Sequence, residues 1–352
     1  MPEWLTESQA VALVGVFGGI LLGLAARLGR FCTLGAIEDA LYGGSDTRLR
    51  MWALAVGTAV IGTFALTGAG LLSETQSFYL SIRWMPMASI LGGLMFGYGM
   101  ALAGNCGYGA IARLGGGDLR SFVIVLVMGV STYVVLAGPL APIRNFFFEQ
   151  LPVTTEVPPG LAHHAARLTG LPVHLIGIAV GLVVVAAALW APALRRDLKA
   201  AFWSVMVGLG IVSGWAGTQY VAATGFEALP IVSHSFSAPV GESILWAMTG
   251  SLRPLSFAVG SVAGVWLGAF IGSLIKGHFR WEACEDPREL RRQIIGAAVM
   301  GAGAVIAMGC TVGQGMSAFS VLAISAPVTS LSIFAGAAFG LRQLIEGFKP
   351  AE

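Results

Sequence analysis

Nine segments of the chain are apolar over the length of a membrane-spanning helix, and this feature limits the possible folds more than any other. A hydrocarbon core of roughly 30 Å is crossed by about 20 helical residues. The segments lie near residues 10–28, 51–72, 86–105, 121–138, 173–190, 201–221, 255–275, 294–310 and 328–345. Backbone polar groups must be satisfied inside a bilayer, so such segments form helices. The sequence therefore predicts an all-α integral membrane protein, a single membrane domain of residues 1–352 with about nine transmembrane helices.

The composition agrees with this fold class. Hydrophobic residues make up 56% of the chain and charged residues only 11%, and the mean hydropathy is +0.80. Values of this kind are typical of proteins surrounded by membrane lipid. The formal net charge of +2 is close to balance, so the charge does not favour a nucleic-acid partner.

The distribution of basic residues predicts the orientation, because short cytoplasmic loops retain Lys and Arg. If the N-terminus lies outside, most Lys and Arg residues fall in inner loops. The outer loops then contain only Arg83, Arg144, Arg167 and Arg253. We therefore expect the N-terminus outside and the C-terminus inside.

A motif of glycines and a cysteine occurs twice in register. The segment GYGMALAGNCGYG at residues 97–109 returns as GAGAVIAMGCTVG at residues 301–313. Under the expected orientation the first copy runs inward and the second outward, an inverted arrangement that recurs in transporters. We therefore divide the chain into a first inverted half (residues 10–138), an outer loop with an extra linking helix (139–200) and a second inverted half (201–345).

Two further apolar pieces are too short to cross a bilayer. They lie near residues 31–42, which carry Cys32, and 236–250, which carry Pro239 and Gly241. Broken helices are tolerated at membrane depth only where protein or a water-filled cavity surrounds them. We interpret both pieces as short broken or re-entrant helices within the two pseudo-symmetric halves.

Cys106 and Cys310 are the strongest candidates for a functional site. Each follows an apolar run and precedes glycines, so we expect a helix break that points backbone N–H groups, and a partial positive charge, at a cavity. A single buried cysteine commonly acts as a small hydrophobe, but two at equivalent repeat positions indicate a function. The neighbours that we expect to support them are Gly104, Asn105, Gly107, Gly309 and Thr311.

Cys32 is the third candidate. Arg30 lies two residues before it, and a nearby cation favours the thiolate; alternatively, this arginine extends to the inner headgroups. The second half has Ser237 near the equivalent position, so three cysteines line the predicted path. Cys284 lies in a charged loop without a repeat partner, and we expect no role for it.

Thiols suit a large, soft anion. A protonated thiol is a weak, polarizable donor, and weak successive sites admit an ion and also release it. An oxyanion with a terminal sulfur fits best. The sequence has no phosphate loop, catalytic triad or nucleotide fingerprint. We therefore expect no catalytic residue, no metal and no cofactor, in a protein that is not an enzyme.

These motifs resemble those of the YeeE/YedE family of bacterial inner-membrane proteins, a sulfur-transport family. The matching segments are GRFC at 29–32, GYGMALAGNCG at 97–107, EDPRE at 285–289, GAG at 301–303 and MGCT at 308–311. The resemblance implies two pseudo-symmetric halves in an hourglass shape, with short helices at a constricted centre and thiosulfate passing along Cys32, Cys106 and Cys310. It also implies the bacterial inner membrane. With the orientation expected from the basic residues, the N-terminus is then periplasmic and the C-terminus cytoplasmic.

Two functions remain open from the sequence. In the first, the chain takes up thiosulfate or a related small sulfur anion without covalent change. In the second, it is a membrane sulfur-relay protein in which a cysteine forms a persulfide and hands sulfur to a cytoplasmic carrier protein. Transport is favoured because the cysteines lie in apolar repeats without an adjacent base.

Overall fold

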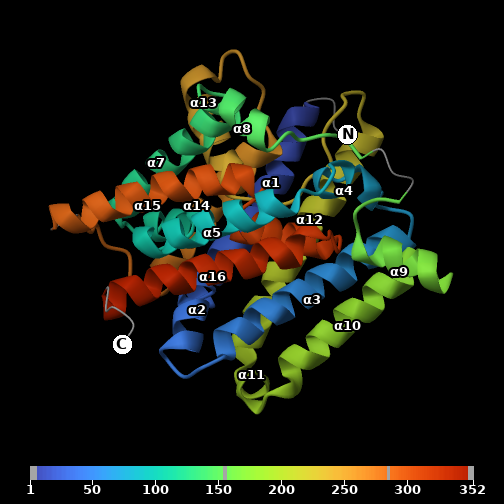
Figure 1. Cartoon of the computed structure of the whole chain (residues 1–352), viewed down its shortest axis with the longest axis horizontal. Helices are drawn as coiled ribbons and strands as arrows, with labels where there is room; N and C mark the ends of the chain where they lie inside the picture. The colour runs from blue at the N-terminus through green and yellow to red at the C-terminus, as the bar shows by residue number, and fades with distance from the viewer. Residues whose placement is uncertain (1–5, 154–156, 284–285, 348–352) are drawn as a thin grey trace.

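The chain is mostly helical (Figure 1). The computed structural model describes residues 6–153, 157–283 and 286–347. The long helices are α1 (Glu7–Leu28), α3 (Thr47–Gly68), α5 (Pro86–Ala103), α7 (Leu119–Leu136), α10 (Val173–Trp190), α12 (Leu198–Thr224), α14 (Phe257–Ile275), α15 (Pro287–Ile306) and α16 (Ser325–Glu346). The short ones are α2 (Thr33–Leu41), α4 (Phe78–Ser81), α6 (Gly107–Leu114), α8 (Ala141–Phe147), α9 (Leu161–Thr169), α11 (Pro192–Arg196), α13 (Ala238–Thr249), the 3₁₀-helix η1 (Glu74–Gln76) and the π-helix η2 (Gly313–Ala318).

Eight helical segments of the described residues are long and apolar enough to cross a membrane. The chain is a multi-pass membrane protein, and the predicted all-α fold class is confirmed. The ninth predicted segment, 294–310, ends α15. This helix is not among the eight because its first turns carry Arg288, Glu289, Arg291 and Arg292. Its second half is apolar and packs between α5 and α7.

The long helices pack in two corresponding sets. α1 packs against α12 and α14, and α12 packs against α1 and α3; α5 packs against α15 and α16, and α15 packs against α5 and α7. Figure 1 shows α5 beside α15 and α16. If α1 is matched to α12, α3 to α14, α5 to α15 and α7 to α16, the contact α1–α14 corresponds to α12–α3 and α5–α16 corresponds to α15–α7, whereas α1–α12 and α5–α15 each correspond to themselves.

Glycines of the repeated motif bring α5 and α15 together. A Cβ at Gly99 would lie 2.5 Å from the backbone nitrogen of Met300, and a Cβ at Gly92 would collide with Ala307. Such close backbone contact is typical of small residues between membrane helices. Residue numbers rise along α5 where they fall along α15. The two helices that carry the motif are therefore antiparallel.

Contacts between other helices show whether those helices run parallel or antiparallel. α1 and α14 run parallel, because Gly15 lies against Ser261 and Gly23 lies against Ala269. The predicted order of crossings requires this direction, as it requires the antiparallel pair α5 and α15. In Figure 1, α8 and α13 lie on the upper side of the molecule, and α2 and α11 lie on the lower side.

The two short apolar pieces predicted from the sequence are confirmed as short helices. They are α2, which follows α1 after a break, and α13, which follows α12 after an irregular segment. α5 continues after a break into α6 in the same way. These breaks lie next to the cysteines.

Candidate functional site

The same backbone conformation precedes each of the three cysteines. The residue two positions earlier lies in the left-handed region, which ends the preceding helix and turns the chain into the next one. These residues are Arg30 (φ 55°) before Cys32, Gly104 (φ 75°) before Cys106 and Met308 (φ 55°) before Cys310. Cys32 and Cys106 are then the N-cap residues of α2 and α6. Each thiol therefore lies at the N-terminal, partially positive end of a short helical segment.

Two cavities enter the protein from opposite sides. The first, of about 460 Å³, extends from Ser8 and Pro254 to Ser235, Ser237 and Gly309; it is the Ser237 cavity. The second, of about 470 Å³, is lined by Cys32, Asn105 and several basic residues; it is the Cys32 cavity. Ser237 begins α13 and Cys32 begins α2, which lie on the two sides of the molecule in Figure 1.

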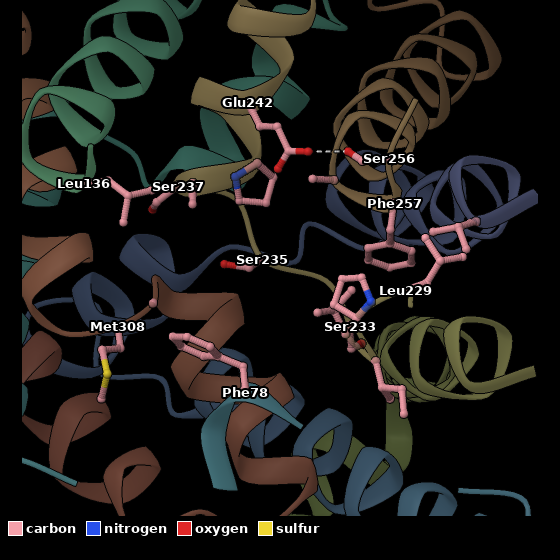
Figure 2. Close-up of a pocket in the computed structure, with 18 of the residues that line it drawn as sticks. Phe78, Leu136, Leu229, Ser233, Ser235, Ser237, Glu242, Ser256, Phe257 and Met308 are labelled. Atoms are coloured by element: carbon pink, nitrogen blue, oxygen red, sulfur yellow. Dashed lines mark hydrogen bonds between the residues drawn. The ribbon is translucent and has the colours of Figure 1, made fainter. Parts of the chain in front are cut away.

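Hydroxyl groups line the Ser237 cavity (Figure 2). Ser233, Ser235 and Ser237 follow one another along the segment before α13. The Glu242 carboxylate accepts a short hydrogen bond from Ser256. No Lys, Arg or His is present among the described lining residues. An anion in this cavity would thus be bound by neutral donors.

Cys310 lies one side chain away from this cavity. Its sulfur accepts hydrogen bonds from the backbone N–H groups of Phe236, at 3.3 Å, and Gly313, at 3.4 Å. The Ser235 hydroxyl, which lines the cavity, lies 3.7 Å from the same sulfur. The thiol is 1% exposed, and it is followed by the π-helix η2, a distortion frequent at functional sites. Because the sulfur accepts the N–H bonds, the S–H hydrogen is left to donate.

Cys106 occupies the closed centre between the cavities. It is fully buried, and its sulfur accepts the Gly109 N–H at 3.4 Å. The Thr33 hydroxyl lies 4.0 Å from it, and the buried Thr311 hydroxyl lies beside it. Cys32 lies next to it, because Cys32 bonds Asn105 and Thr33 contacts Cys106. Cys310 directly precedes Thr311 in the chain, so Cys106 lies between the other two cysteines.

Basic groups dominate the Cys32 cavity. Cys32 donates to the Asn105 side-chain oxygen at 3.7 Å. The five basic residues of the lining, besides His278, are Arg27, Arg30, Arg48, Arg113 and Lys276. One acidic residue, Glu38, is in the same lining. An anion that reaches this cavity thus meets an excess of positive charge.

The basic groups of this cavity are held in different ways. Arg48 forms an ion pair with Asp39 at 3.1 Å, whereas Arg27 donates to the Ser273 hydroxyl at 2.6 Å. The Lys276 ammonium donates to the backbone oxygen of Arg27. Burial, followed by repulsion from Arg30, Lys199 and Arg27, lowers the pKa of Lys276. The part of this shift that comes from the neighbouring cations is repulsion that a bound anion would relieve.

The residues expected to support the cysteines divide between the two cavities and the centre. Arg30, Gly104 and Asn105 line the Cys32 cavity. Gly309 and Ser237 line the Ser237 cavity. Thr311 lies at the centre, and Gly107 is a packing position, since a Cβ there would meet the Phe236 oxygen at 2.7 Å. Ser237 matches Cys32 in beginning a short helix but faces the opposite cavity. Cys284 lies outside the described residues.

The chain matches the family of sulphur transport proteins over residues 28–339. It belongs to this family. The resemblance to the YeeE/YedE sulfur-transport proteins, inferred from the cysteine motifs, is thereby confirmed.

Relatives of this sulphur transport family member cover most of its length. The thiosulfate transporter TsuA of Escherichia coli (strain K12) is 25% identical over 324 residues, which are 87% of each chain. The thiosulfate transporter TsuA of Spirochaeta thermophila is 23% identical over 329 residues, which are 92% of this chain and 96% of the relative.

Several residues of this family member's two cavities were not expected from the sequence. Tyr79 and Ser235 reach the end of the Ser237 cavity near Cys310, and Arg113 and Lys276 line the Cys32 cavity. Tyr79 lies between two predicted spans and has no repeat partner, so no local signal marks it. Arg113 and Lys276 supported only the predicted membrane orientation, because their convergence on Cys32 depends on packing between distant helices.

Proposed function

We propose that this chain takes up thiosulfate, or a closely related sulfur-containing anion, across the bacterial inner membrane. The anion passes intact along Cys310, Cys106 and Cys32. The observation that carries the proposal is that two cavities on opposite sides approach the two ends of this series of neighbouring thiols. The names of both relatives, thiosulfate transporter, support this substrate.

In this proposal the Ser237 cavity opens to the periplasm and the Cys32 cavity to the cytoplasm. The excess of Arg and Lys in the Cys32 cavity supports this orientation, because cytoplasmic regions retain positive charge. The N-terminus is then periplasmic and the C-terminus cytoplasmic. The halves 10–138 and 201–345 form an inverted repeat around the thiols, with 139–200 between them. The antiparallel packing of α5 and α15 and the matched helix contacts support that repeat.

Thiols at helix N-termini provide weak, sequential anion sites. The sulfurs of Cys106 and Cys310 accept backbone N–H bonds, so each S–H group can donate to the terminal sulfur of thiosulfate. An arginine at this depth would hold the anion more tightly and slow its release. Because Cys106 is fully buried, passage requires the side chains around it, Phe236 and Tyr108 among them, to move.

The alternative, a sulfur relay to a cytoplasmic carrier, requires a thiolate that attacks the terminal sulfur of thiosulfate, forms a persulfide S–S bond and releases sulfite. Such a thiolate needs a base or a strong positive field. The hydrogen-bond partners of the three thiols in the described residues are backbone N–H groups, hydroxyls and the Asn105 amide oxygen. None of these partners is a base, and of the three thiols Cys32 alone lines the cavity with the basic residues, so the series of three thiols supports passage of the intact ion.

The test is uptake of radiolabelled thiosulfate by proteoliposomes. We expect the variant with Cys32, Cys106 and Cys310 all replaced by Ala to lose uptake, and the control Cys284→Ala to keep it. Wild-type rates in the triple variant would contradict the proposal. Intact-mass measurement of the purified protein after exposure to thiosulfate separates the alternatives, because a relay adds one sulfur atom and passage adds none.

A further inference from the structure

Three hydroxyl groups surround the inner end of the Ser237 cavity, next to Cys310. Ser235 and Ser237 come from the segment before α13, and Tyr79 comes from α4. These elements are far apart in the sequence, so their meeting is a product of the fold. The thiol path described above does not use them.

Ser235 and Tyr79 converge on one point. A Cβ at Gly313 would lie 2.8 Å from the Ser235 hydroxyl oxygen and 3.1 Å from the Tyr79 hydroxyl oxygen. Gly313 itself donates its backbone N–H to Cys310. The glycine therefore lets the two hydroxyls lie close to the backbone that bonds Cys310, because a side chain would collide with them in this shared space.

Ser237 adds a hydroxyl without a partner. Its side-chain oxygen is buried and makes no hydrogen bond, although the residue is only 3% exposed and lines the cavity. A buried donor without an acceptor is unfavourable. Figure 2 shows Ser237 and Ser235 on the same part of the cavity wall, whereas the Glu242 carboxylate is directed to Ser256. An anion near Ser237 would thus meet a hydroxyl rather than a carboxylate.

We propose that Ser235, Ser237 and Tyr79 form an oxygen-binding subsite for a tetrahedral sulfur oxyanion, which presents its terminal sulfur to Cys310. The subsite rests on the proposed function and deepens it, because separate groups bind the oxygens and the terminal sulfur of the anion. The hydroxyls bind the oxygens, which thiosulfate shares with sulfate, and the thiols bind the terminal sulfur, which sulfate lacks. Sulfate therefore occupies the subsite without passing beyond it.

Neutral donors explain how this subsite can bind the anion and still release it. Hydroxyls bind an anion without a full opposite charge, so the complex is weaker than one with arginine. Glu227 and Glu242 in the same cavity weaken it further by repulsion. A weak first site is what rapid passage to Cys310 requires.

The experiment measures thiosulfate uptake with unlabelled sulfate as a competitor on the side of the Ser237 cavity. For Ser237→Ala and Tyr79→Phe we expect KM for thiosulfate and the inhibition constant of sulfate to rise together. The rise should be about three- to tenfold, because water in the open cavity partly replaces the lost hydrogen bond. The maximal rate should change less. Ser237→Thr retains a hydroxyl and should restore both constants.

Two matched controls distinguish binding from folding. Ser243→Ala removes a hydroxyl from α13 that is bonded to the Pro239 backbone and should leave both constants unchanged. Gly313→Ala fills the shared space, whereas Gly315→Ala in the same π-helix would meet its nearest atom, on Trp52, only at 3.3 Å. We expect the first to raise both constants and the second to leave them near wild type.

The subsite is contradicted if Ser237→Ala and Tyr79→Phe leave both constants unchanged. It is also contradicted if they alter only thiosulfate uptake and leave sulfate inhibition intact, since oxygen recognition must affect both anions. Neither result bears on the thiol path, which is tested separately by the cysteine variants.

Discussion

The two cavities are almost equal in volume, about 460 and 470 Å³, but their linings differ in charge. The described lining of the Ser237 cavity has hydroxyls and two carboxylates and no basic residue. The Cys32 cavity has a lysine, one arginine in an ion pair and three arginines that form no ion pair with the described residues. In the proposed pathway, one side would bind the anion by neutral hydrogen bonds and the other by charge. The free energy of an anion along the proposed path is therefore asymmetric, because the two cavities would stabilise it in different ways.

The asymmetry has a physical use if the Cys32 cavity faces the cytoplasm. An anion that enters a cell works against the membrane potential, at about 2.3 kcal/mol per elementary charge and 100 mV. Positive charge at the inner end stabilises the anion where this electrical cost is greatest. It does not change the overall equilibrium, but it lowers the barrier on the inner side.

The largest effect is expected at the centre, where neither cavity reaches. Cys106→Ala removes a donor from a fully buried position. A hydrogen bond to an ion contributes about 1.5 to 3 kcal/mol, so initial uptake rates in proteoliposomes should fall by roughly 10- to 100-fold. Cys32→Ala should reduce the rate less, because basic groups of its cavity still hold the anion. Equal losses in the two variants would contradict a compensating role for these charges.

Much of the fold could be predicted from the sequence, because length and hydrophobicity are local signals. The spans, the short helices α2 and α13 and the positions of Cys106 and Cys310 in a repeat all follow from such signals. The polar first turns of α15 show the limit of hydropathy, since that helix packs in the bundle despite its charges.

The chemistry of the cavities could not be predicted in the same way. Arg113 and Lys276 meet Cys32 only because α6 and α14 pack together near α1. Tyr79 reaches Gly313 across an equally long stretch of sequence. Ser237 lies at the start of a short helix, as expected, but the cavity that it lines could not be inferred. Each cysteine follows a left-handed residue two positions earlier, whereas Ser235, two positions before Ser237, is not left-handed. Tertiary packing decides all of these points.

A smaller effect is expected from the charges of the Cys32 cavity. Arg30→Gln and Arg113→Gln each remove a cation that forms no ion pair within the described residues. For partly exposed charges we expect a cost of about 1 kcal/mol, which is roughly a fivefold loss of thiosulfate affinity measured by counterflow from the Cys32 side.

Salt dependence sharpens this test of the two cavities. Added salt should weaken wild-type affinity on the Cys32 side and diminish the difference between wild type and variants, because exposed charges are screened. Affinity on the Ser237 side should respond little. The control Arg342→Gln removes an exposed arginine that pairs with Glu346 and does not line either cavity. Equal salt dependence on both sides would remove the basis for the asymmetry.

The smallest effect is expected from pH at Lys276. Burial and the neighbouring cations lower its pKa, so this lysine loses its proton at a lower pH than an ordinary lysine. As the pH on the Cys32 side rises into the alkaline range below the ordinary lysine pKa, Lys276 should lose its positive charge before an ordinary lysine does, and thiosulfate affinity should fall by about two- to fivefold. A bound anion raises the pKa of Lys276 again, so binding at alkaline pH is coupled to proton uptake.

In Lys276→Arg the charge persists, and the affinity should no longer vary over this range. If Lys276→Arg keeps the wild-type pH profile, the titrating group is not Lys276. Affinity on the Ser237 side should not respond to Lys276→Arg, because the described lining of that cavity has no basic residue.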